Sequence, residues 1–263
     1  MSNSRGAPTG VETRKPNSAR VYNYLLGGKD NYEVDQLVAQ RMLDVAPDTG
    51  TVARLSRRFL VQAVRIAAEA GIRQFVDLGA GIPVSPNVHE IAQKIDESAR
   101  VASVDHDPVV YMHSTALLSG VPGVIPMLAD IRRTDELIDR LRTEALIDFD
   151  RPVAILLVGV LHFVVDKAQP PAIIARLRTE LAPGSYLAFT HGSDESDRSF
   201  MLQSLSDTAG STAQSVYRSR DEVHGFFDGF EFLGPGLVPI QKWLDDGPPR
   251  TGLVILGGIC RKP

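Results

Sequence analysis

The stretch FVDLGAGIP, residues 75–83, decides the fold of this 263-residue chain. A short apolar run leads into two glycines, Gly79 and Gly81, which are spaced for a tight turn. Glycine adopts backbone conformations that other residues avoid and lets a ligand approach the main chain closely. In parallel sheets, turns of this kind lie at the carboxyl edge, where ligands bind. The stretch therefore predicts a buried strand with a ligand site directly after it.

Beyond this stretch, short apolar runs alternate with helical segments. Strands are predicted at 75–79, 101–105, 124–128, 153–159 and 186–190. Helices are predicted between and after them at 87–98, 108–118, 133–142, 167–182, 194–213 and 220–227. Such alternation is typical of βαβ units, which form a parallel sheet through right-handed crossovers.

The two ends of the chain extend this α/β core. An amphipathic helix is predicted over 51–70, and a short helix, a glycine turn and a second helix over 17–50. Late in the chain, FEFLG with LVPI and then GLVILGGIC predict two strands in an antiparallel hairpin, joined by the long loop QKWLDDGPPRT. Residues 1–16 have no apolar period and are predicted to be disordered. We therefore expect one domain over 17–263, with a helical segment at 17–50 and a Rossmann-like core at 51–263.

Composition restricts the possible partners. The chain is 43% hydrophobic and 23% charged, as in ordinary globular proteins. Its net charge of −4 and the lack of a dense Lys/Arg stripe argue against a nucleic-acid partner. A single cysteine, no signal peptide and no apolar run of about 18 residues predict a cytoplasmic protein without a membrane partner. No His, Asp or Cys cluster has metal-ligand spacing, so no metal is expected.

The residues around the glycine turn distinguish between nucleotide ligands. A dinucleotide fingerprint would place a third glycine at position 84, which is Val84 here, and Pro86 delays the following helix. Asp77 precedes the first glycine by two positions, and its carboxylate suits a ligand with a positive amino group but repels a diphosphate. The pattern favours S-adenosylmethionine (SAM) over NAD, while a plain glycine turn stays open as an alternative.

Acidic residues also follow the next two predicted strands. Asp105 ends the second strand, where a carboxylate can accept hydrogen bonds from both hydroxyls of a ribose. The neighbouring Asp107 is better placed to cap the next helix. Asp130 follows the third strand and can accept from an adenine amine while the Ile131 N–H reaches a ring nitrogen, although a capping or loop role is the alternative. We expect these acidic residues to line one crevice.

The fourth predicted strand continues into LVGVLHF. This run lacks the Asp/Asn-Pro-Pro-aromatic signature of methyltransferases that act on amide or nucleobase nitrogens. His162 follows the strand where an acceptor would approach, so it is a candidate general base near neutral pH. A structural role is the alternative for His162. His191, after the fifth strand, is a second candidate on the rim of the crevice.

With these residues in view, the chain resembles a family of SAM-dependent methyltransferases that was long catalogued as a domain of unknown function. The matching stretches are SARVYNYLLGGKDNYEVD, FVDLGAGIPVSPNVHEIAQ, VDHDPVV, LLVGVLHFVVD and RSRDEVHGFFDGFEFLGPGLV. The resemblance implies the class I Rossmann-like fold, a seven-stranded, mostly parallel sheet with an antiparallel last strand. It also implies that Asp77, Gly79 and Gly81 hold the methionine end of SAM, Asp105 the ribose and Asp130 the adenine.

The segment GGKDNY, residues 27–32, is expected to form a lid with a Gly27-Gly28 hinge. Tyr24 and His162 are the candidate catalytic residues, with packing of the helix as the alternative for Tyr24. The predicted cofactor site is completed by Gly28, Asn31, Ala80, His106, Ile131 and Val158. The sequence thus predicts methyl transfer from SAM to a small-molecule acceptor, the alternative being a SAM-binding regulatory protein without catalysis.

Overall fold

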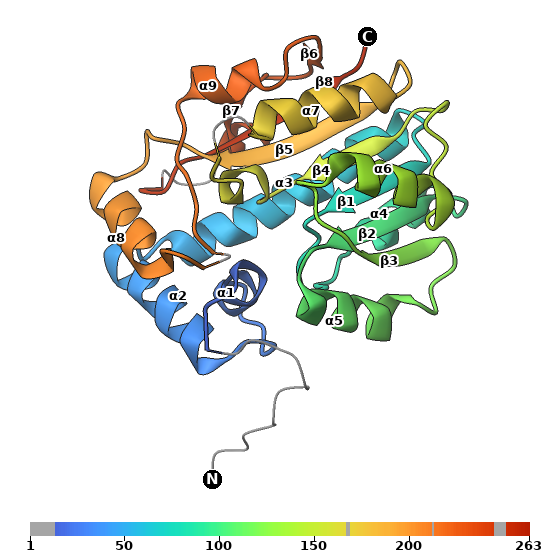
Figure 1. Cartoon of the computed structure of the whole chain (residues 1–263). Helices are drawn as coiled ribbons and strands as arrows, with labels where there is room; N and C mark the ends of the chain where they lie inside the picture. The colour runs from blue at the N-terminus through green and yellow to red at the C-terminus, as the bar shows by residue number, and fades with distance from the viewer. Residues whose placement is uncertain (1–13, 167–168, 212, 245–250) are drawn as a thin grey trace.

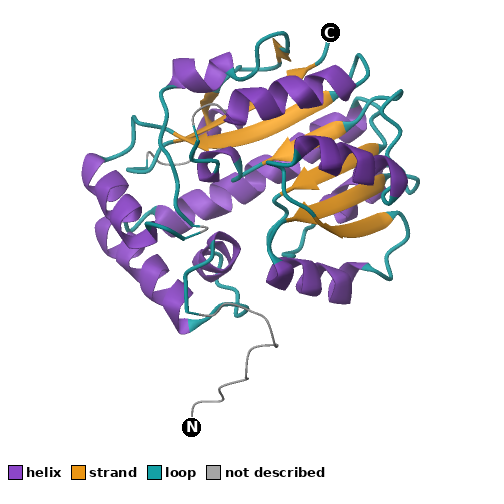
Figure 2. Cartoon of the chain, viewed as in Figure 1, coloured by secondary structure: helices purple, strands orange, loops and turns teal. Residues whose placement is uncertain are grey.

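An eight-stranded sheet with helices on both faces forms the centre of the molecule (Figures 1 and 2). The computed structural model describes residues 14–166, 169–211, 213–244 and 251–263. The strand order is β3-β2-β1-β4-β5-β8-β6, and β7 also pairs with β8. Five strands are parallel: β1 (Gln74–Leu78), β2 (Arg100–Asp105), β3 (Val124–Leu128), β4 (Ala154–Leu157) and β5 (Tyr186–Gly192). The predicted class I α/β fold is confirmed.

Two apolar cores lie on the two faces of the sheet. One face packs against α6 (Thr134–Thr143) and α7 (Gln169–Glu180), with Leu137 and Leu177 fully buried. The other packs against α3 (Thr49–Glu69) and α4 (Val88–Ile95) around Phe59. Because both faces are covered, the central strands are buried from end to end, as parallel strands usually are.

The C-terminal strands differ from the prediction. Three short strands are present, β6 (Glu231–Phe232), β7 (Val238–Pro239) and β8 (Ile255–Arg261), and β8 is antiparallel to β5, β6 and β7. Gly234 and Gly236 have φ values of +52° and +78°, a conformation that breaks a strand, so FEFLG and LVPI cannot form one continuous strand. The sheet therefore has eight strands rather than seven. The loop QKWLDDGPPRT begins within a 3-10 turn, η2 (Ile240–Trp243), and its residues 245–250 lie outside the described residues.

Of three further helices, α5 (Pro108–Leu118) has the predicted bounds, and α8 (Arg198–Thr208) and α9 (Arg220–Gly225) are shorter than predicted. α8 is shorter than the predicted 194–213 because Asp197 caps its start by accepting hydrogen bonds from the Ser199 and Phe200 N–H groups. No helix among the described residues combines the length and apolar character that a membrane crossing requires.

The N-terminal part of the chain contributes α1 (Ser18–Leu25) and α2 (Glu33–Val45) before α3. α1 packs on α2, and α2 packs on α8, so N-terminal helices and a helix that follows β5 lie together beside the sheet (Figure 1). Of the predicted disordered stretch, residues 1–13 lie outside the described residues, and 14–16 form neither helix nor strand.

Candidate active site

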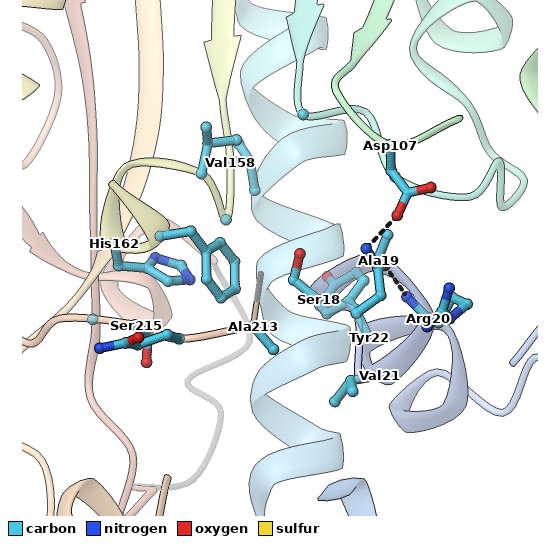
Figure 3. A pocket seen from close by; sticks show the side chains of 18 of the residues that line it. Ser18, Ala19, Arg20, Val21, Tyr22, Asp107, Val158, His162, Ala213 and Ser215 are labelled. Atoms are coloured by element: carbon cyan, nitrogen blue, oxygen red, sulfur yellow. Dashed lines mark hydrogen bonds between the residues drawn. The ribbon is translucent and has the colours of Figure 1, made fainter. Parts of the chain in front are cut away.

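A cavity of about 830 Å³ lies between the carboxyl ends of the parallel strands and α1. Its size falls within the range of about 300–1,000 Å³ that is usual for small-molecule sites. The predicted residues that line it are Asp77, Gly79, Ala80, Gly81, Asp105, His106, Asp130, Ile131, Val158 and His162. In Figure 3, α1 with Ser18 and Tyr22 faces His162, Ala213 and Ser215 across the cavity. The predicted crevice is therefore one wall of a larger chamber.

The glycine turn after β1 has the backbone that only glycine adopts readily. Gly79 and Gly81 have φ values of +70° and +68°. The N–H groups of Gly79 and Ala80 both donate to the carbonyl oxygen of Val104, at 2.8 and 3.0 Å. A Cβ on Gly79 would lie 2.5 Å from Cγ2 of Val160, whereas a Cβ on Gly81 would meet nothing within 4 Å. Packing therefore requires glycine at position 79, and position 81 leaves open space beside the main chain for a ligand.

Asp105 is fixed in place by backbone donors. The N–H of Gly81 donates to its Oδ2 at 2.9 Å, and the N–H of Asp107 donates to its Oδ1 at 3.0 Å. His106 hydrogen bonds to Asp105, which raises the pKa of the histidine despite its partial burial. A carboxylate has about four acceptor positions, so a fixed Asp105 can still accept hydrogen bonds from a ligand in the cavity.

The carboxylate of Asp77, on β1, lies within range of the positive charge of Arg57, on α3, and no ion pair joins the two in the described chain. Burial raises the pKa of Asp77 to about 6; the charge of Arg57 opposes this rise, and that of Asp105 adds to it. Within the described chain, no hydrogen bond reaches the Asp77 carboxylate. Arg57, from α3, donates to the carbonyl oxygens of Val84 and Pro86, but its Nε is buried without a hydrogen-bond partner. This arrangement complements a ligand that carries both an ammonium and a carboxylate.

Arg57 was missed in the sequence because no local motif marks it. The helical spacing of Ala53, Arg57 and Leu60 places this arginine on a buried, otherwise apolar face of α3. A cation within an apolar stripe of a helix was the feature of the sequence that could have identified Arg57.

Asp130 lines the cavity beside its own ion-pair partner. Burial disfavours ionisation, but the hydrogen bonds and charge of Arg132 prevail and lower the pKa of Asp130. Arg132 Nη2 lies 2.6 Å from Asp130 Oδ2. Asp130 is therefore ionised. Its carboxylate accepts hydrogen bonds from Arg132 and can also accept from a ligand in the cavity.

The GGKDNY segment is positioned differently from the predicted lid. Tyr24, Gly28 and Asn31 are not among the described residues that line the cavity. Instead, Oδ1 of Asn23 accepts hydrogen bonds from the Asp30 N–H at 3.0 Å and the Asn31 side chain at 2.9 Å. A Cβ on Gly28 would lie within 2.6 Å of the Asn23 side chain. The two glycines thus allow a tight turn around Asn23, and residues 27–32 are not among the described residues that line the cavity.

The first turn of α1 covers the cavity in place of that segment (Figure 3). The Asn17 amide donates to the carboxylate of Asp107, and its Oδ1 accepts from the Arg20 N–H at 3.1 Å as the cap of α1. Arg20 in turn forms a buried ion pair with Asp35, with Nε and Oδ2 2.7 Å apart. These contacts connect the start of α1 to the loop between β2 and α5. Asp107 also accepts from the Val109 N–H, so the predicted helix cap is confirmed.

His162 lies in the 3-10 turn η1 (Leu161–Phe163), with its ring directed into the cavity (Figure 3). Burial, with smaller effects from His191 and Arg218, lowers its pKa to about 3. Its Nδ1 is buried without a hydrogen-bond partner. The ring is therefore uncharged at neutral pH, and it is a much weaker base than the sequence predicted.

The prediction that His191 lies on the rim is wrong, because His191 is completely buried. Its Nδ1 lies 2.8 Å from the Gly192 carbonyl oxygen, and Arg218 Nη1 lies 2.8 Å from its Nε2. Arg218 also donates from Nη2 to the carbonyl oxygen of Val164 at 2.9 Å. Arg218, which the sequence did not single out, thus holds η1 against the end of β5.

Among the described residues, no group of three or more His, Cys, Asp or Glu side chains is arranged to hold a metal ion.

The chain is similar to known proteins over nearly its whole length. A family model described as S-adenosyl methyltransferase matches residues 4–263. The structure of a candidate methyltransferase from Thermobifida fusca YX has a TM-score of 0.90 and 36% identity, covering 98% of this chain and 99% of that chain. A DUF574 family protein from Streptomyces avermitilis has a TM-score of 0.89 and 35% identity, covering 95% and 99%.

A more distant structure has the same fold. The N-methyltransferase NodS from Bradyrhizobium japonicum, in complex with S-adenosyl-l-homocysteine (SAH), has a TM-score of 0.52 and 14% identity, covering 93% of this chain and 99% of that chain. The search of curated proteins found no match.

Proposed function

Because the chain belongs to the S-adenosyl methyltransferase family and uses SAM, we propose that it methylates a small-molecule acceptor held in the cavity under α1. One observation carries this proposal. The cavity contains the residues suited to SAM and continues beyond them to Ser18, His162 and Tyr217, which leaves space for a second molecule.

The chain's own residues match the chemistry of SAM part by part. Asp77 and Arg57 would hold the ammonium and carboxylate of its methionine end, since each has unused bonding capacity and the two charges complement the ligand. The open main chain at Gly81, next to Ala80, would accommodate the same end. Asp105 would accept from the ribose hydroxyls.

The adenine would lie farther along the same edge. Asp130 would accept from its exocyclic amine and the Ile131 N–H would donate to a ring nitrogen, with His106 and Val158 beside them in the cavity lining. When bound, SAM supplies an electrophilic methyl group attached to a positively charged sulfur.

Methyl transfer requires alignment and exclusion of water more than it requires protein chemistry. The acceptor would supply the electron pair for the new bond to the methyl carbon, the electron pair of the carbon–sulfur bond would stay on sulfur, and the acceptor proton would be released to bulk solvent. We propose that His162 orients the acceptor by a hydrogen bond, because an uncharged ring with a pKa of about 3 is too weak a base to take that proton. Tyr24 is given no catalytic role, since it does not belong to the described lining.

The test is transfer of labelled methyl. The protein is incubated with SAM labelled in its methyl group and with a fractionated small-molecule extract, and the label is followed by mass spectrometry in the small-molecule and protein fractions. Asp105→Ala serves as the control for cofactor-dependent labelling. Label in a small molecule supports the proposal; tight binding of SAH without any transfer would favour a SAM-binding regulatory protein instead.

A further inference from the structure

The charges around the cavity are distributed unevenly. Every Asp, Glu, Lys or Arg among the described lining residues lies at or before residue 132, in the N-terminal segment, on α3, or at the ends of β1 to β3. From Val158 onward, the described lining residues are all uncharged at neutral pH, including His162, whose pKa burial lowers to about 3. The cavity therefore has a charged half, suited to SAM, and a neutral half around η1, α8 and residues 213–217.

Most polar groups of the neutral half already have partners. The Thr190 hydroxyl accepts from the Gly159 N–H at 2.8 Å, and the Tyr217 hydroxyl hydrogen bonds with Ser204 and Ser215. Phe200 packs edge-on against Tyr217, with ring centroids 6.4 Å apart. These contacts leave a surface of aromatic rings and satisfied hydroxyls.

Among the described lining residues of this half, His162 alone has a buried polar side-chain atom without a hydrogen-bond partner. No hydrogen bond to its ring occurs within the part of the chain that the structure describes, and its Nδ1 is buried without a partner. A neutral imidazole carries one donor and one acceptor, and buried polar groups are nearly always hydrogen bonded in native proteins. The other ring nitrogen, Nε2, also has no hydrogen-bond partner in the described chain and, unlike Nδ1, is not enclosed, so a ligand with a single hydroxyl or amine would pair with Nε2.

The charge of Arg218 is directed away from the cavity. Its guanidinium lies behind η1, where it contacts His191 and the carbonyl oxygens of Leu161 and Val164, and Arg218 is 4% exposed. An acidic ligand group in the neutral half would lose its hydration without gaining a direct cationic partner, which is unfavourable.

From this distribution we infer that the methyl acceptor is an uncharged, mainly apolar ring compound with one hydroxyl or amine group, bound with that group against His162. The inference rests on the proposed function, because it assigns the charged half of the cavity to SAM.

Three ligands of similar size test the inference: 2-naphthol, 2-naphthoate and 2-naphthylmethylammonium, which are neutral, negative and positive at pH 7. Each is titrated into the SAH-saturated protein, and also into the protein without SAH. We expect 2-naphthol to bind at least about tenfold more tightly than either charged ligand, because the neutral half offers no counter-charge. His162→Phe keeps a ring of similar shape and should weaken 2-naphthol binding about fivefold.

A variant that adds a negative charge to the neutral half tests whether the missing counter-charge sets the ligand preference. Ser18 is the first residue of α1 and faces His162 across the cavity, and an acidic residue is favourable at a helix N-terminus, so Ser18→Asp should fold (Figure 3). Ser18→Asp should improve binding of 2-naphthylmethylammonium relative to 2-naphthol, and neutral Ser18→Asn should not.

Preference of the unmodified protein for either charged ligand, or binding of none of the three, would overturn the inference. Failure of the proposed function has a different signature, namely absent SAH binding or absent methyl transfer, and the titrations without SAH still report on the neutral half in that case.

Discussion

The backbone N–H of Gly81, in the turn after β1, donates a hydrogen bond at 2.9 Å to the carboxylate of Asp105, the last residue of β2. This bond joins the glycine turn after β1 to the acidic end of β2. A ligand that contacts the open main chain at Gly81 therefore meets a carboxylate whose orientation is already fixed. Preorganisation of this kind lowers the entropy that binding must overcome.

Replacing Asp105 should weaken cofactor binding more than it weakens the fold. We expect Asp105→Ala to reduce SAH binding by about 1.5–3 kcal/mol, roughly 10- to 150-fold, because charge-assisted hydrogen bonds to the ribose are lost. Calorimetric titration measures the effect, and Asp139→Ala, at a carboxylate that is 80% exposed, is the control. An affinity within twofold of the unmodified protein would remove Asp105 from the site.

Cofactor binding should also depend on the ionisation of Asp77. Its pKa of about 6 lies above the ordinary 3.8, so the ionised carboxylate destabilises the unliganded fold at higher pH, and this penalty disappears as pH falls and the group takes up a proton. A ligand ammonium attracts only the ionised form. SAH affinity should therefore rise as pH increases through about 6 and fall by up to about tenfold per pH unit below it.

Asp77→Asn separates this effect from other titrations. His106, whose pKa is raised by Asp105, stays in place in that variant, as does Arg57. We expect the variant to bind SAH weakly and with little change from pH 5 to 8. A pH dependence as steep as that of the unmodified protein would assign the effect to His106.

Arg57 should recognise the carboxylate of the methionine end. Arg57→Gln is expected to weaken SAH binding about tenfold, and to leave the binding of 5′-methylthioadenosine, which lacks the amino acid, within about twofold. The neighbouring Arg58→Gln, on the exposed side of α3, is the matched control. Equal loss of both ligands would mean that Arg57 acts only by supporting the loop at Val84 and Pro86.

The contact between Asn17 and Asp107 should hold α1 over the bound cofactor. Asn17→Ser retains a side chain that can cap α1 but removes the amide that donates to Asp107. We expect SAH to dissociate about three- to tenfold faster while the melting temperature changes little. Asn87→Ser, at the cap of α4, provides the same substitution at another helix start. An unchanged dissociation rate in stopped-flow measurements would show that α1 does not retain the ligand.

The parts of the site that the sequence predicted are those encoded locally. Each of the first three parallel strands ends in or next to an acidic residue, and two glycines with positive φ mark the turn after β1. Parallel topology then brings these residues to one edge of the sheet. No pairing information from distant segments was needed for Asp77, Gly81, Asp105 or Asp130.

Residues that depend on tertiary packing were missed or misplaced. Arg57 reaches the cavity from the middle of a helix, and Asn17 does so by pairing with Asp107, 90 positions later. The Gly27-Gly28 pair resembles a hinge in the sequence, but the following residues donate hydrogen bonds to Oδ1 of Asn23 and hold the segment in a tight turn. The basicity of His162 also depends on burial among distant residues, which its local sequence does not encode.

The most direct test of the central claim is a calorimetric titration of the protein with SAH, with NAD as the control ligand, repeated on Asp105→Ala. We expect micromolar binding of one SAH per chain, no measurable binding of NAD, and a marked loss of SAH binding in the variant. Binding of NAD in preference to SAH, or binding of neither, would contradict the assignment of this cavity to SAM.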